Sequence, residues 1–157
     1  EKADVSLKYI DGTQHVILNG EDVSDQIRTE EVSKAASVVS AYPQVRKNLT
    51  ALQKKLAESE NVVMDGRDIG TCVLPNADLK IYLTASAEVR GKRRFKELTA
   101  KGEKADLTEI VEDIKKRDEA DMTREISPLK KADDAVEVDS SDMTIDDVVA
   151  RIKGLYD

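Results

Sequence analysis

Two carboxylates and a guanidinium stand close together in the chain, at Asp65, Arg67 and Asp68. An arginine can fork onto a phosphate, and a carboxylate beside it can hold a metal-bound water or accept hydrogen bonds from an amine. The three residues follow a short apolar run, residues 62–64, which is typical of a strand in a parallel sheet. Because ligands gather at the carboxyl ends of such strands, we expect a ligand site here.

Two other interpretations of these residues stay open. The first is a tight turn closed by a local ion pair, in which Asp65 is a structural acid that accepts from the amides of its own loop. The second makes Asp65 and Asp68 the nucleophile and the acid of a phosphatase or transferase. That chemistry requires both carboxylates to converge on one phosphate, and Arg67 between them gives it little support.

A second group of polar residues lies on one predicted helix, at Arg117, Asp121 and Arg124. The spacing i, i+4, i+7 points all three side chains the same way as long as the helix continues. Two guanidiniums with an acid between them can hold a phosphate and a ribose hydroxyl at once. The alternative is an intrahelical ladder of ion pairs, which adds only tenths of a kcal/mol to stability.

Two further sets of polar residues also have an ordinary and a functional interpretation. Ser37 and Arg46 flank a helix break at Tyr42-Pro43. In the functional interpretation both side chains face the same cleft, and in the ordinary one both are exposed to solvent. Arg93 and Arg94 belong to a run of basic residues on a predicted helix, and such a run is usually a solvated face.

The first sixty residues predict a small unit of strands and helices. Residues 1–20 have the alternation of a β-hairpin, with its turn at Asp11-Gly12 and a second turn signal at Asn19-Gly20. A helix begins at Thr29, because a hydroxyl cap is followed there by two acids, and it breaks before Pro43. The proline then opens a second helix.

The rest of the chain predicts an α/β core. Short apolar runs at 62–64, 79–83 and 135–139 indicate strands, and capped periodic segments indicate helices that start near residues 86, 106 and 144. We therefore expect one domain at 1–60 and a second at 61–157, whose helical arm covers about 86–125.

Composition narrows the function classes. The net charge of −7 argues against a nucleic-acid partner, and the scarcity of aromatic residues argues against a base-stacking platform. No apolar run approaches a membrane span, and Cys72 and His15 offer neither a disulfide framework nor a zinc site. We expect a cytoplasmic monomer and, because the chain begins with Glu1, a piece of a longer polypeptide.

The chain resembles a known family over almost its whole length. Two segments resemble bacterial cytidylate kinases: DGRDIGTCVLPNADLKIYLTAS and RDEADMTREISPLKKADDAVEVDSS. A third, NGEDVSDQIRTEEVSKAASVVSAYPQVR, resembles the monophosphate-binding insert of those enzymes. The resemblance implies phosphoryl transfer from ATP to CMP or dCMP, with Mg²⁺, on the parallel sheet of a P-loop kinase core.

The resemblance also implies a role for each candidate residue. Ser37, Arg46 and Asp68 surround the cytosine, whose acceptors and exocyclic amine suit such a set. Arg67 and Arg124 grip the CMP phosphate, while Asp121 and Arg117 read the sugar. Arg93 and Arg94, on the arm that resembles a lid, neutralise the transferring phosphoryl group. Asp65 ends a strand where such enzymes often keep a carboxylate near magnesium.

The sequence departs from the family pattern in one respect. None of its seven glycines lies in a G-x-x-x-x-G-K-[ST] loop. We therefore expect an incomplete kinase core that lacks the first strand and the P-loop, and a chain that is inactive alone. Two non-catalytic interpretations remain: a CMP-binding module, and an acidic interaction domain with no nucleotide role.

Overall fold

The computed structural model describes residues 3–40 and 42–156 and divides the chain into two compact units, Glu1–Leu49 and Thr50–Asp157. This division falls inside a helix, α2 (Pro43–Ser59), and the predicted domain boundary lies just after the same helix. The domain assignment itself stays a prediction. In chain order, the other elements of the first unit are β1 (Val5–Ile10), β2 (Thr13–Leu18), β3 (Glu21–Asp22), the 3-10 helix η1 (Gln26–Arg28) and α1 (Glu30–Val39).

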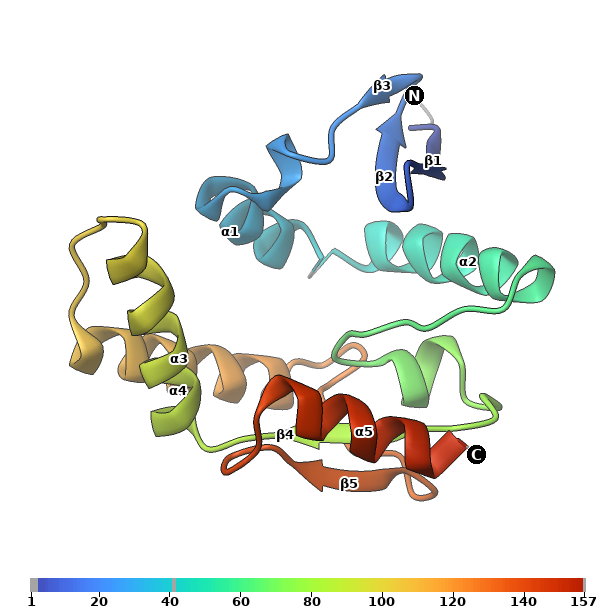
Figure 1. Cartoon of the computed structure of the whole chain (residues 1–157). Helices are drawn as coiled ribbons and strands as arrows, with labels where there is room; N and C mark the ends of the chain where they lie inside the picture. Colours follow the sequence, from blue (N-terminus) through green and yellow to red (C-terminus); the bar gives the residue numbers. More distant parts are fainter. Residues whose placement is uncertain (1–2, 41, 157) are drawn as a thin grey trace. The chain divides into compact units, whose positions relative to one another are not determined.

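The first unit begins with the hairpin that the sequence predicts. β1 and β2 pair antiparallel along their whole length. Asp11 and Gly12 have φ angles of 50° and 77°, the left-handed conformation that a two-residue type I′ turn requires. Asn19 and Gly20 repeat this pattern at 52° and 88° and lead into β3, which pairs with β2 (Figure 1). Both predicted turns are therefore confirmed.

The predicted helix start and helix break are confirmed as well. Thr29 caps α1, and its hydroxyl oxygen accepts from the Val32 N–H at 3.3 Å. The helix ends at Val39, and α2 begins at Pro43. Proline fits the first position of a helix because the amide it lacks has no intrahelical partner there.

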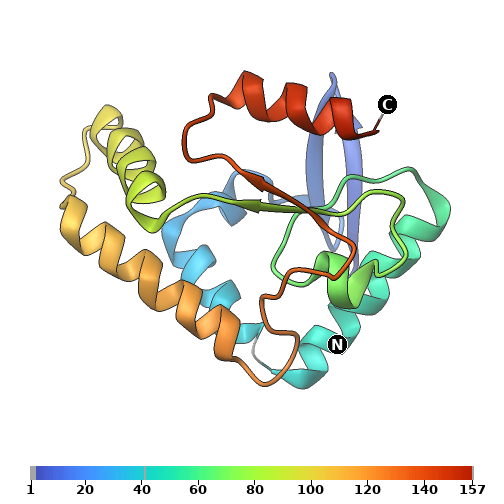
Figure 2. The same ribbon diagram turned by 90° about the horizontal axis from the view of Figure 1, so that it is seen from below.

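The second unit contains a parallel sheet. Its elements are the π-helix η2 (Ile69–Val73), β4 (Ile81–Thr84), α3 (Ala87–Ala100), α4 (Leu107–Thr123), β5 (Val136–Asp139) and α5 (Ile145–Tyr156). β4 and β5 pair in parallel, and α3 and α4 form the crossover that such a pair needs. α5 runs alongside the two strands in both views (Figures 1 and 2). The α/β class with a parallel sheet is thus confirmed.

The strand predicted at residues 62–64 is wrong. Residues 61–65 have no regular secondary structure, and Val63 is fully exposed. A strand needs backbone hydrogen bonds to a neighbour, and within the described residues β4 pairs only with β5. The apolar run therefore has no partner strand in this structure.

Candidate functional site

Three of the predicted site residues come together in the second unit: Arg67, Asp121 and Arg124. Arg67 Nε donates to Asp121 Oδ2 at 2.9 Å, across 54 residues of sequence. Arg124 Nη1 lies 3.4 Å from the other carboxylate oxygen, Oδ1. The Asp121 side chain is only 14% exposed. Two guanidiniums thus share one half-buried carboxylate, and the group, which we call the arginine cluster, has one net positive charge.

The C-terminal end of α4 builds half of the arginine cluster. The helix ends at Thr123, and Arg124 leaves the helical conformation with φ −61° and ψ 142°. Arg124 Nε donates to the Ser127 carbonyl at 2.6 Å, and the Leu129 N–H donates to the Asp121 carbonyl at 2.8 Å. The turn, and not a continuing helix, therefore brings Arg124 beside Asp121.

This turn contains a strained residue. Ser127 has a φ of 51°, a left-handed conformation that costs an L-residue roughly 1–2 kcal/mol. Strain of this kind persists only where the surrounding contacts fix it, and it is common at functional sites.

The arginine cluster has donors left over. Arg124 Nη2 is buried and has no hydrogen-bond partner in the part of the chain that the structure describes. An unpaired buried donor of this type is costly, so it is a natural place for a ligand oxygen. Arg67 is 45% exposed and donates to Asp121 through Nε. Guanidinium donors in this arrangement suit the oxygens of a phosphate or a carboxylate.

Asp68, next to Arg67, is buried, with 9% of its surface exposed. It directly precedes η2, where the Leu74 N–H donates to the Ile69 carbonyl at 2.7 Å. Hydrogen bonds that span five residues define a π-helix, and single π-turns are frequent at functional sites. The loop that carries Arg67 and Asp68 therefore ends in an unusual but well-bonded turn.

The other arginines on α3 and α4 do not join the arginine cluster. Arg117 is exposed and has no ion pair or hydrogen bond among the described residues. Arg93 Nη2 donates to the Ser140 carbonyl at 2.6 Å, in the loop between β5 and α5. Arg94 pairs with Glu97 at 2.9 Å along α3. The roles predicted for these three arginines stay predictions.

The residues predicted to surround the base lie in different units. Ser37 belongs to α1, but its side chain is outside the residues that the structure describes. Arg46 is half-buried in the first turn of α2, where its Nε donates to the Ser40 carbonyl at 3.1 Å. Both belong to the first unit, whereas Asp68 belongs to the second. The cytosine-binding set therefore stays a prediction.

The residues that the structure describes do not by themselves form a complete magnesium or triphosphate site. Asp65 is exposed, and the described residues include no group of three His, Cys, Asp or Glu side chains able to hold a metal ion. The sequence also lacks the glycine-rich lysine loop that cradles a triphosphate. The metal role of Asp65 stays a prediction.

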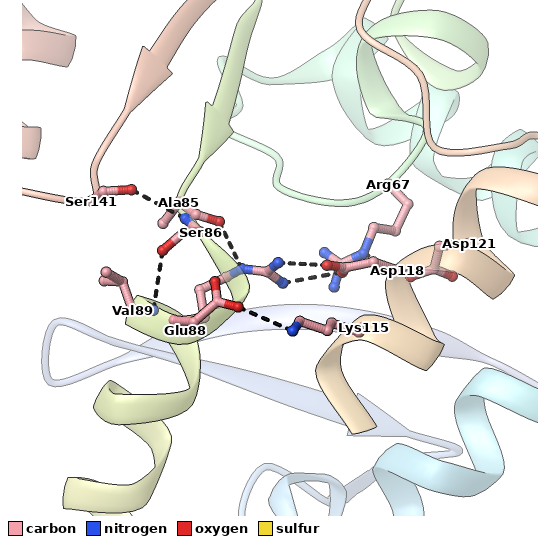
Figure 3. A network of polar contacts seen from close by, with 10 residues as sticks. Arg67, Ala85, Ser86, Glu88, Val89, Lys115, Asp118, Asp121 and Ser141 are labelled. Atoms are coloured by element: carbon pink, nitrogen blue, oxygen red, sulfur yellow. Dashed lines mark hydrogen bonds and ion pairs between the residues drawn. The ribbon is translucent and has the colours of Figure 1, made fainter. Parts of the chain in front are cut away.

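One strong contact of the second unit was missed by the sequence analysis. Arg90 donates from Nη1 and Nη2 to the two oxygens of Asp118, at 3.0 and 2.5 Å, and from Nε to the Ala85 carbonyl at 3.0 Å. Figure 3 labels the two partners, Ala85 and Asp118. Asp118 raises the pKa of Arg90 above its usual value. Arg90 was visible only as one member of a basic run, and no spacing in the sequence pairs it with a residue on α4.

Fold and site together define a class of protein. A parallel sheet with a helical crossover, and an arginine cluster suited to an anionic group, are consistent with a nucleoside monophosphate kinase fold. Within the described residues, no helix is long and apolar enough to cross a membrane.

Comparison with known proteins identifies the family. The family described as Cytidylate kinase matches residues 2–157. The cytidylate kinase of Caldicellulosiruptor bescii is 51% identical over 153 residues, which cover 98% of this chain and 68% of that protein. The cytidylate kinase of Caldanaerobacter subterraneus is 50% identical over 151 residues, with coverages of 96% and 66%. The chain belongs to the cytidylate kinase family, and it spans about two thirds of the length of these relatives.

Proposed function

We propose that this chain forms the CMP-binding and lid parts of a cytidylate kinase, which transfers a phosphoryl group from ATP to CMP or dCMP with Mg²⁺. Membership of the family and the names of its relatives support the reaction class. In such reactions the protein contributes mainly positioning and charge neutralisation. Arginines that converge on one anionic group are therefore the features to look for.

The observation that carries the proposal is the unpaired donor of Arg124. Its Nη2 is buried without an acceptor in the described residues, while its Nε and Nη1 are held by Ser127 and Asp121. The side chain is thus fixed at two nitrogens and able to donate from the third. A phosphate oxygen of CMP would satisfy Nη2, and the exposed guanidinium of Arg67 would take a second oxygen.

The remaining roles follow the chemistry of the nucleotide. Ser37, Arg46 and Asp68 would read the cytosine, because donors to its ring acceptors and a carboxylate for its amine together reject uracil. Asp121 would accept from the sugar through lone pairs that Arg67 and Arg124 leave unused. Arg117 would assist it.

The two lid arginines would act on the transferred group. Arg93 can do so only after it gives up the carbonyls of Ser140 and Met143, to which its Nη2 donates at 2.6 and 3.3 Å. Arg94 need give up only its exposed pair with Glu97. Asp65 would lie near the metal ion.

We further propose that these 157 residues bind CMP but do not catalyse the reaction alone. Binding of CMP draws on the arginine cluster, which is present. Transfer also requires the triphosphate to be held in line with the acceptor, and no residues here form the loop that does this. No catalytic step can therefore be assigned to this chain by itself.

Two measurements on the purified chain test the proposal. Isothermal titration calorimetry should show binding of CMP and dCMP, and weaker binding both of cytidine, which lacks the phosphate, and of UMP, which has the wrong base. A coupled assay with ATP, CMP and Mg²⁺ should show no turnover above the buffer rate. Equal affinity for CMP and UMP would overturn the cytosine-reading roles, and no CMP binding would overturn the nucleotide role. Ordinary turnover would overturn only the proposal that the chain is inactive alone.

A further inference from the structure

We propose that Arg90 is a positioning residue for the phosphate site: it fixes α4 against the end of β4 and so sets where Asp121 meets Arg67. The inference rests on the proposed function, because it concerns the same arginine cluster. Arg90 touches neither Arg67 nor Arg124 among the contacts of its guanidinium, so any effect on the site must pass through α4.

Arg90 joins three elements with one guanidinium. The residue lies on α3, its Nη1 and Nη2 hold the two oxygens of Asp118 on α4, and its Nε holds the carbonyl of Ala85. Ala85 directly follows β4 and is 8% exposed. A guanidinium is planar and rigid, so a two-point contact fixes both distance and orientation. The C-terminal half of α4 is therefore tied to a buried backbone group at the end of β4 (Figure 3).

The packing between α3 and α4 leaves little room for adjustment near this contact. A Cβ on Gly91, the residue after Arg90, would come within 2.4 Å of Val111 Cγ2. The two helices thus approach so closely that a larger residue at position 91 would displace the side chain of Val111. With the crossing fixed at Val111, the fork on Asp118 determines how the last turn of α4, which ends at Thr123, is rotated.

Asp121 of the arginine cluster lies in this last turn. Asp121 lies one turn after Asp118 on the same helix, and its carboxylate must reach Arg67, which comes from a loop 54 residues earlier. Because a helix moves as a rigid element, a slip at Asp118 displaces Asp121 from Arg67. A displacement of about 1 Å between groups that must converge on one ligand strongly weakens their combined interaction with it.

A second ion pair between the same helices provides a matched control. Lys115 Nζ lies 3.0 Å from Glu88 Oε1, and both side chains are about half exposed, at 49% and 59%. This pair is a single contact in solvent and does not involve the end of β4, so it should contribute little to the position of α4. Loss of Glu88 therefore removes a charge from α3 without releasing α4.

The experiment compares Arg90→Lys with Glu88→Gln in the full 157-residue chain. Lysine keeps the charge but cannot fork, so α4 loses its orientation. The first readout is hydrogen exchange at the Arg67 Nε–H, measured by NMR without ligand. We expect exchange to be about tenfold faster in Arg90→Lys and unchanged in Glu88→Gln. Asp118→Asn, which keeps the volume of the side chain but breaks the fork, should repeat the effect if Arg90→Lys does not fold.

The second readout is affinity for CMP and for cytidine. Arg90→Lys should weaken CMP binding about tenfold and leave cytidine binding unchanged, because only the phosphate uses the arginine cluster. An unchanged Arg67 exchange rate, or equal losses for CMP and cytidine, would overturn the inference. If the unmodified chain binds no CMP, the proposed function fails, and the exchange measurement still decides whether Arg90 positions Asp121.

Discussion

Asp22 in the first unit and Asp121 in the second each accept hydrogen bonds from two other residues, but they differ in how far along the chain those residues lie. In the first unit, Asp22 pairs with His15 at 2.6 Å and accepts from the Ser24 hydroxyl and N–H at 2.6 and 3.0 Å. All of these partners lie within seven residues of it. In the second unit, Asp121 holds Arg67 and Arg124, and Arg67 comes from 54 residues away.

The two carboxylates differ in what they leave unsatisfied. Ser24 also accepts from the Val16 N–H on β2 at 2.9 Å. Asp22, His15 and Ser24, which we call the closed group, are therefore bonded to one another and to the backbone of the three-stranded sheet. The arginine cluster around Asp121, which we call the open group in this comparison, keeps a buried donor, Arg124 Nη2, that has no acceptor in the described chain. A closed hydrogen-bond network stabilises a fold, whereas an open one is ready to bind an anion. Asp22 therefore belongs to a satisfied structural network, whereas Asp121 belongs to a group that keeps one donor available.

The largest effect should come from Arg124. Arg124→Met removes the donor that the phosphate would use, and a lost charge-assisted hydrogen bond weakens CMP binding about a hundredfold. Calorimetry with CMP and cytidine measures the change, and cytidine affinity should stay the same. Lys116→Met, which removes one positive charge from the exposed face of α4, is the matched control. A similar loss in the control would mean that only net charge matters.

A smaller loss should follow Arg67→Met. The Arg67 side chain is 45% exposed, so solvent screens its interaction with a phosphate, and we expect about a tenfold weaker affinity for CMP. The same titration measures it. A loss larger than that of Arg124→Met would reverse the ranking of the two arginines.

Disturbed packing between α3 and α4 should destabilise the unit that holds the open group and leave the environment of the closed group unchanged. Gly91→Ala introduces a Cβ that meets Val111. Overpacking offset by the better helix propensity of alanine leaves a net destabilisation of about 1 kcal/mol. Thermal unfolding measures it, and the His15 resonances should not move.

Gly154→Ala is the control for this substitution. Gly154 lies in α5 and has nothing within 4 Å of an added Cβ, so this variant should be slightly stabilised. Destabilisation in both variants would remove the steric explanation.

The smallest effect is the pH dependence of the closed group. Hydrogen bonds from Ser24, with a further one from His15, lower the pKa of Asp22 from 3.8 to about 2. Folding thus favours the ionised form of Asp22. The contribution of this carboxylate to the free energy of unfolding is therefore complete above pH 3.8 and is lost as the pH falls towards 2. Carbon-13 NMR of the carboxyl group measures the titration, and Ser24→Ala should move it upward. A midpoint near the ordinary value in the unmodified chain would contradict the closed network.

Local features of the fold were predictable from the sequence. Turn chemistry fixed the hairpin at Asp11-Gly12, and Asp106 caps α4 by accepting from the Glu109 N–H at 3.0 Å, as the capping pattern indicates. The strand at residues 62–64 was not predictable, because an apolar run becomes a strand only where a neighbour pairs with it. Residue type was visible in the sequence, but the partner was not.

The candidate site shows the same division. The residue types and the helix indicated Asp121 and Arg124, but the turn at Ser127 and the reach of Arg67 depend on tertiary packing. The contact between Arg90 and Asp118 joins residues 28 positions apart on two helices. No periodicity within either helix predicts it.

Nitrogen-15 NMR of the arginine guanidiniums during a titration with CMP shows whether the free donor of Arg124 takes the phosphate. We expect the Arg124 Nη signals to shift and rotation about its Cζ–Nε bond to slow when CMP binds, while cytidine leaves them unchanged. Arg124 signals that respond equally to CMP and cytidine, or to neither while CMP binds, would contradict this expectation.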